Sequence, residues 1–187
     1  MLTPEEKREL LEIARQSIAH ALVRDRGGRQ GHVGGRKYTG GLAEPSGAFV
    51  TIRIGEDLRG CIGYIESTMP VGEVVSEVAA KAATEDPRFM PMTQGELARA
   101  TLEVSILSPL KQVARVDEIE VGRHGLLLEL GRHRGLLLPQ VATEYGWDRE
   151  KFLEYTSRKA GLPAEAWKDP EAKIYFFSAE IIHEDAA

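Results

Sequence analysis

The spacing of apolar residues changes along the chain from helical to alternating and back. Segment 3–22 carries an apolar stripe at helical spacing and opens with Thr3-Pro4-Glu5-Glu6, where a capping threonine and a glutamate three residues later satisfy free amides of a helix start. The same spacing recurs from Val71 to Ala82, and it must end before Pro87 because the residue preceding a proline disfavours helical angles. Both segments are therefore predicted helices.

Strand signals lie between and after these helices. Phe49–Ile54 and Leu58–Ile65 are rich in β-branched or apolar residues and flank Gly55-Glu56-Asp57, which predicts a hairpin. Thr93 begins a second capping-box pattern and a short helix, and Leu102–Ile106 then alternates as a strand. Glu103 points away from the apolar face of that strand, where it is either solvated or lines a cleft.

The C-terminal half contains two similar sequence stretches. Gly122–Leu128 and Gly131–Leu138 resemble each other and predict a second hairpin, with a helix opening at Pro139. Because a hairpin, a proline and a helix follow one another twice, we predict an internal duplication: one module of two lobes, built around hairpins 48–66 and 122–138, with a cleft between them. Asp148 caps a further helix that stops at Gly161. Ile174–Ile182 predicts a closing strand buried on both faces.

Segment 25–47 is rich in glycine and charge and poor in large apolar residues, which predicts a long surface connection. Two interpretations remain open. The segment is a plain flexible loop, or it is a flap that presents Arg29, His32, Arg36 and Lys37 to an anion.

Composition narrows the possible functions. The 187 residues suit one module with an ordinary core at 42% hydrophobic content, and the net charge of -5 makes nucleic-acid binding unlikely because such binding relies on a basic surface. A single cysteine can form neither an internal disulfide nor a multi-cysteine zinc site. No apolar run has the length of a membrane span, so we expect no membrane contact and a cytoplasmic location.

That cysteine is the main candidate for chemistry. Alternation along a strand places Arg59, Cys61 and Gly63 on one face, and a neighbouring guanidinium favours the thiolate, the nucleophilic form. Gly60 and Gly63 would let another backbone or a substrate approach closely. In the alternative interpretation, Cys61 is a buried apolar filler and the glycines mark a bulge or a tight crossing.

A nucleophilic thiol needs a base, and His124 at the start of the second hairpin is the predicted one. We thus predict Cys61, Arg59 and His124 as catalytic residues. Metal binding is not predicted, because Cys61, His124 and Glu103 lack the spacing of a metal motif. Asp86 and Arg88, on either side of Pro87, are interpreted as a solvated end or a local ion pair.

Leu58-Arg59-Gly60-Cys61-Ile62-Gly63 resembles the signature of the AMMECR domain family, which includes the A component of the AmmeMemoRadiSam system. Further stretches resemble that family in the same order, so the resemblance covers nearly the whole chain: Gly47–Thr51, Glu85–Phe89, Leu102–Ser105, Gly135–Val141 and Lys159–Pro163. It implies an α+β, two-lobed fold with antiparallel sheets flanked by helices, and no settled activity.

The resemblance also bears on the site. Gly60, Gly63, Glu103 and Gln140 fall in the matching stretches and are predicted to contact an unknown small molecule. A Memo-type protein and a radical SAM protein are the implied partners, and no cofactor is specified. Ser157 stands where the family has a cysteine, which argues against a second thiol working with Cys61.

Three function classes stay open. The leading one is an enzyme, or an enzyme subunit, that uses Cys61 in the cleft between the lobes. The second is a module that binds a ligand or a protein without covalent chemistry. The third, ranked last because of the net charge, binds nucleic acid through the basic glycine-rich loop.

Overall fold

The structure, a computed structural model, describes residues 2–24 and 36–184, and the chain divides into two compact units. Unit 1 contains the residues up to Leu107 and those from Glu180 on, and unit 2 contains Ser108–Ala179. Arg29 and His32 of the predicted flap lie outside the described residues. Both units combine helices with antiparallel strands, which confirms the α+β class.

Unit 1 begins with α1 (Pro4–Arg24), whose start has the predicted capping box: Glu6 N donates to Thr3 Oγ1 at 3.2 Å and Thr3 N donates to Glu6 Oε2 at 2.8 Å. A short 3-10 turn, η1 (Gly40–Ala43), follows, and it places Leu42 in the core. The segment around η1 therefore contributes more to the core than its composition suggested.

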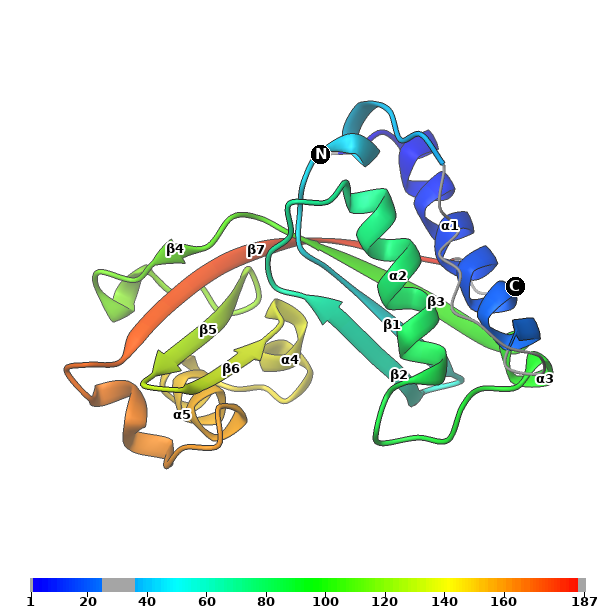
Figure 1. Ribbon diagram of the computed structural model, residues 1–187. Helices are drawn as coiled ribbons and strands as arrows, with labels where there is room; N and C mark the ends of the chain where they lie inside the picture. The colour runs from blue at the N-terminus through cyan, green and yellow to red at the C-terminus, as the bar shows by residue number, and fades with distance from the viewer. Residues whose placement is uncertain (1, 25–35, 185–187) are drawn as a thin grey trace. The chain divides into compact units, whose positions relative to one another are not determined.

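The first hairpin consists of β1 (Ala48–Ile54) and β2 (Asp57–Tyr64), and β3 (Ala100–Leu107) pairs with the other side of β1. Between the hairpin and β3 the chain forms α2 (Val71–Thr84) and α3 (Gln94–Leu97), both close to their predicted limits. Figure 1 shows α1 and α2 on the same side of this sheet. Alternate strand residues, such as Val50, Ile52 and Val104, form one buried cluster with these helices.

The pairing of β2 with β1 contains an irregularity. Ile52 pairs with Gly60 and Arg53 pairs with Leu58, so Arg59 is the extra residue of a β-bulge. A bulge interrupts strict alternation, and the sequence offers a bulge as one explanation of Gly60 and Gly63 without identifying Arg59 as the extra residue.

Unit 2 contains the second hairpin, β5 (His124–Leu130) and β6 (His133–Leu137), followed by α4 (Pro139–Glu144) and α5 (Arg149–Lys159). Both units thus contain a hairpin followed by a helix. The sequence missed the two-residue strand β4 (Lys111–Gln112) and the 3-10 turns η2 (Val116–Glu118) and η3 (Ala164–Lys168).

The last strand, β7 (Lys173–His183), pairs with β5 on one side and with β4 on the other, and its end belongs to unit 1. Its burial differs from the prediction. Ile174, Phe177 and Ile182 are buried, while most of the other positions are only partly covered, so the strand is not buried on both faces throughout. Among the described residues, no helix has the length and apolarity to cross a membrane.

Candidate functional site

Cys61 lies in β2 and forms a row with residues of the next two strands. It pairs with Thr51 of β1, which in turn pairs with Glu103 of β3. Val50 and Ile52, the neighbours of Thr51, point into the helix-covered core, so alternation places this row on the opposite side of the sheet. We call this side of β1–β3 the Cys61 face.

The thiol makes a specific contact on that face. Cys61 Sγ lies 3.3 Å from Thr51 Oγ1, within hydrogen-bond distance for sulfur, and Cys61 itself is half-buried. Burial is the main influence on the group and raises the pKa of the Cys61 thiol, while the Thr51 hydrogen bond and the Arg88 charge oppose the rise. The sequence predicts that a neighbouring guanidinium favours the thiolate, whereas in the structure burial acts in the opposite direction and favours the protonated thiol.

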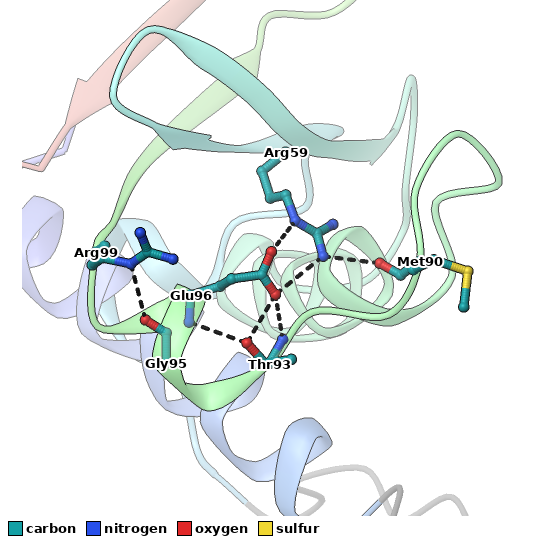
Figure 2. Close-up of polar contacts among 6 residues, drawn as sticks. All are labelled: Arg59, Met90, Thr93, Gly95, Glu96 and Arg99. Carbon is teal, nitrogen blue, oxygen red and sulfur yellow. Dashed lines mark hydrogen bonds and ion pairs between the residues drawn. The ribbon is translucent and has the colours of Figure 1, made fainter.

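The expected role of Arg59 also needs correction. Arg59 Nε donates to Glu96 Oε1 at 2.7 Å, and Nη2 donates to the carbonyl of Met90 at 3.0 Å (Figure 2). Its side chain is thus directed at the segment before and within α3 rather than at the sulfur. The physical reason is the bulge, which removes Arg59 from the regular alternation that suggested a shared face with Cys61.

Glu96 has two functions in this network (Figure 2). It closes the capping box of α3 by accepting from Thr93 N at 2.8 Å, and it binds the Arg59 guanidinium with both carboxylate oxygens. The Arg59 hydrogen bond is the largest of the effects that lower the pKa of Glu96 to about 2. Arg59 therefore links β2 to the first turn of α3.

The charged groups closest to the Cys61 backbone are Asp86 and Arg88. Cys61 N donates to Asp86 Oδ2 at 2.9 Å, and Arg88 Nη2 lies 3.4 Å from the Cys61 carbonyl oxygen. The two side chains form an ion pair of 2.7 Å, and Asp86 is only 4% exposed. The Arg88 hydrogen bond is the main reason why the pKa of Asp86 falls to about 2. The local ion pair expected from the sequence is present, but its carboxylate is buried and also accepts a hydrogen bond from the backbone amide of Cys61.

Other parts of the protein fill the space beside the two glycines of the signature. A Cβ on Gly60 would lie 2.2 Å from the carbonyl oxygen of Ala82 in α2, and a Cβ on Gly63 would lie 2.3 Å from Phe49 Cγ. Gly60 therefore lets the strand approach the helix, and Gly63 accommodates an aromatic ring. Neither observation reserves space for a substrate.

Two further polar groups lie on the Cys61 face. Glu103 is mostly buried, and its Oε2 lies 3.3 Å from His183 Nδ1. Ser105, two residues further along β3, is 1% exposed, and its hydroxyl has no hydrogen-bond partner among the described residues. A buried hydroxyl without a partner is uncommon, and it marks a place where a ligand or water would supply the missing bond.

His124 and Gln140 belong to unit 2. The His124 ring stacks on Phe176 with centroids 4.4 Å apart, and its Nδ1 accepts a hydrogen bond from Glu120 N at 3.1 Å. Burial lowers the pKa of His124, so the ring is neutral with its proton on Nε2. Neither ring nitrogen then has a free lone pair with which to take a proton. Gln140, in the first turn of α4, is half-buried.

Other predicted features have local explanations. Ser157, which replaces the cysteine of the resembling family, is buried in α5 and donates to the carbonyl of Leu153 at 3.0 Å. Among the described residues, no three His, Cys, Asp or Glu side chains are grouped to hold a metal ion. Sequence reasoning missed Thr51 and Ser105 as parts of the site, although both fall in stretches that resemble the family, and it interpreted Asp86 and Arg88 only as a solvated end or a local ion pair.

Together these observations define a two-unit α+β protein with a half-buried thiol on one sheet face. The AMMECR1 family matches this chain over residues 11–182, and the chain belongs to that family. Protein MK0488 of Methanopyrus kandleri is 41% identical over 98% of this chain and 91% of its own length. A protein of Methanothermobacter thermautotrophicus is 44% identical over 98% of this chain and 97% of its own length.

A solved structure confirms the fold. The crystal structure of an uncharacterized protein, PH0010 from Pyrococcus horikoshii, superposes with a TM-score of 0.89 at 37% identity and covers 98% of this chain and 94% of its own. The names of these relatives assign no activity.

Proposed function

We propose that this AMMECR1-family protein is a binding module whose ligand or partner docks on the Cys61 face, with the thiol in its protonated form. The pairing of the two arginines nearest to Cys61 carries this proposal, because an unpaired cation beside the sulfur would favour a thiolate, and burial raises the pKa of the thiol in the same sense. Arg59 is committed to Glu96 and Arg88 to Asp86. The unpartnered hydroxyl of Ser105 on the same face adds a place for a polar contact.

The test is the rate of Cys61 alkylation by iodoacetamide between pH 6 and pH 10 in the folded protein. We expect the rate to rise through this range with a midpoint above about 8.5, the ordinary thiol value. A rate that has already reached its plateau at pH 7 would show a thiolate and would contradict the proposal. The same titration in urea supplies the reference for an unburied thiol.

The family resemblance supplies candidate occupants, namely a Memo-type protein and a radical SAM protein. Their affinity can be measured by calorimetry with each purified protein from the same organism. Because serine keeps the size and hydrogen bonding of a neutral thiol, Cys61→Ser is expected to bind within about threefold of the unmodified chain, whereas Cys61→Trp, which covers the face from a half-buried position, is expected to lose binding. If both variants bind equally well, the Cys61 face does not take part in binding the partner.

A second candidate is an enzyme, or an enzyme subunit, in which Cys61 becomes a nucleophile once a substrate is bound. The row Cys61–Thr51–Glu103 favours it, because the hydroxyl that contacts the sulfur has a carboxylate as its neighbour across the next strand pair. Glu103 would replace His124 as the group that receives the thiol proton. For this candidate, Cys61→Ser and Glu103→Gln would each abolish turnover and leave binding intact.

A further inference from the structure

Unit 2 carries a series of stacked aromatic side chains with an arginine at one end. Trp147 stacks with Tyr145 at a centroid distance of 5.0 Å and an interplanar angle of 15°, and with Tyr155 at 4.1 Å and 11°. The Arg158 guanidinium carbon lies 5.3 Å from the Tyr155 ring centroid. We call these four residues the aromatic series.

Tyr145 is the most exposed ring of the aromatic series. Tyr155 contacts both Trp147 and Arg158 and is 40% exposed, whereas Tyr145 contacts Trp147 alone within the series and is 68% exposed. A ring that is stacked on one side and still so exposed leaves its other side accessible. Another planar group could therefore extend the series at Tyr145.

Basic side chains accompany the aromatic rings along α5. Lys151 lies four residues before Tyr155, and Arg158 and Lys159 lie three and four residues after it, so the basic side chains line the same side of the helix as Tyr155, and all four are exposed. Among the described residues, no carboxylate forms a salt bridge with Lys151, Arg158 or Lys159. The positive charge of this stripe is thus available to an anion.

Net charge does not oppose an anionic ligand in this unit. Unit 2 has as many basic as acidic side chains, so the whole excess of acid in the chain belongs to unit 1. The argument against nucleic acid from the charge of the full chain therefore does not apply to this surface. Stacked aromatic rings beside basic side chains are what proteins use to hold unpaired bases and their phosphates.

We propose that the aromatic series binds a single-stranded nucleic acid, with one base stacked on Tyr145 and the phosphates of neighbouring nucleotides near the basic stripe of α5, because Tyr145 and Arg158 lie at opposite ends of the series. A free nucleotide could contact only one end of the series, so it serves as the competitor in the test. The parallel orientation of the rings favours a flat ligand over the irregular side chains of a protein surface, for which no parallel stacking is required.

The experiment measures fluorescence anisotropy of labelled oligothymidylate, about ten nucleotides long, with the full chain at low salt, and competition by thymidine monophosphate. Binding that weakens roughly tenfold or more in Tyr145→Ala, and that persists in Tyr145→Phe, supports the proposal, since loss of one stacked base costs about 1–3 kcal/mol. Tyr145 is exposed, so its replacement leaves the core intact, and circular dichroism checks this.

Charge reversal provides the second arm. The double variant Lys151→Glu with Arg158→Glu is expected to lose binding, and Lys173→Glu, an exposed lysine of the same unit, is the matched control that should retain it. Weak competition by the monophosphate supports a strand as the ligand, and competition at concentrations close to those of the oligomer contradicts it. Absence of binding by both probes, or equal binding by Tyr145→Ala, overturns the proposal.

Discussion

The backbone amide of Cys61 donates a 2.9 Å hydrogen bond to the carboxylate of Asp86, which lies 25 positions further along the chain. The same carboxylate binds Arg88, whose guanidinium returns to the Cys61 carbonyl oxygen. Asp86 and Arg88 thus occupy the backbone groups that a neighbouring strand would otherwise use. This arrangement links the signature strand β2 to the segment after α2 and sets the electrostatic surroundings of the thiol.

Replacing Arg59 and Arg88 one at a time should show which arginine influences the pKa of Cys61. Arg88→Met is expected to raise the pKa of Cys61 further, because it removes the cation that lowers that pKa and leaves the Asp86 charge uncompensated. Arg59→Met should leave the thiol pKa unchanged, since Arg59 is paired with Glu96. The pH dependence of Cys61 alkylation measures both. If Arg59→Met gave the larger shift, the guanidinium of Arg59 would be the one that acts on the sulfur.

Asp86→Asn should shift the pKa of the Cys61 thiol in the opposite direction. Removal of the negative charge while Arg88 stays in place is expected to lower the pKa of Cys61, and the same alkylation profile detects it. The variant should also lose about 2 kcal/mol of unfolding free energy in urea, because it weakens charge-assisted hydrogen bonds to a buried carboxylate. Asp57→Asn, an exposed aspartate in the same strand as Cys61, is the control, for which neither change is expected.

Acid should destabilise the protein through the same carboxylate. The pKa of Asp86 is lowered from 3.8 to about 2 in the folded state, so its contribution to stability is present above pH 4 and is lost as the pH falls towards 2. A shift of this size corresponds to roughly 2 kcal/mol. Urea unfolding at a series of pH values measures the loss, and Asp86→Asn should show a shallower decline. A parallel decline in both proteins would assign the acid sensitivity to other groups.

Gly60 should tolerate no side chain. Gly60→Ala would place a Cβ 2.2 Å from the carbonyl oxygen of Ala82, so β2 and α2 would have to separate, at an expected cost of about 2–3 kcal/mol. Gly95→Ala is the matched control, because a Cβ there meets nothing within 4 Å, and alanine favours the helical position. Chemical denaturation compares the two. Equal stability would mean that β2 and α2 can separate at no cost.

His124 should be neutral across the physiological range. Burial against Phe176 lowers the pKa of its imidazole, so its ring protons should titrate below the ordinary imidazole value of about 6.5 in nuclear magnetic resonance spectra. A midpoint above about pH 6.5 would show that the ring is accessible to protons and open to a function as a base.

Local patterns predicted much of the secondary structure. The capping boxes at Thr3 and Thr93, the hairpin turns and the helix that ends before Pro87 depend on neighbours within a few residues, and the structure contains each of them. Elements that exist only through distant pairing were missed, as with the two residues of β4, whose strand character comes from β7.

The sequence by itself determined the family, the α+β class, the helices and the two hairpins, because capping, turn formation and hydrophobic periodicity act over short distances. Tertiary structure alone decided the chemistry around Cys61. The bulge at Arg59 redirects a guanidinium to Glu96, and the distant Asp86 and Arg88 take the place beside the cysteine. Whether a thiol ionises depends on burial and on charges brought near it by folding, and neither is written in the residues that surround it along the chain.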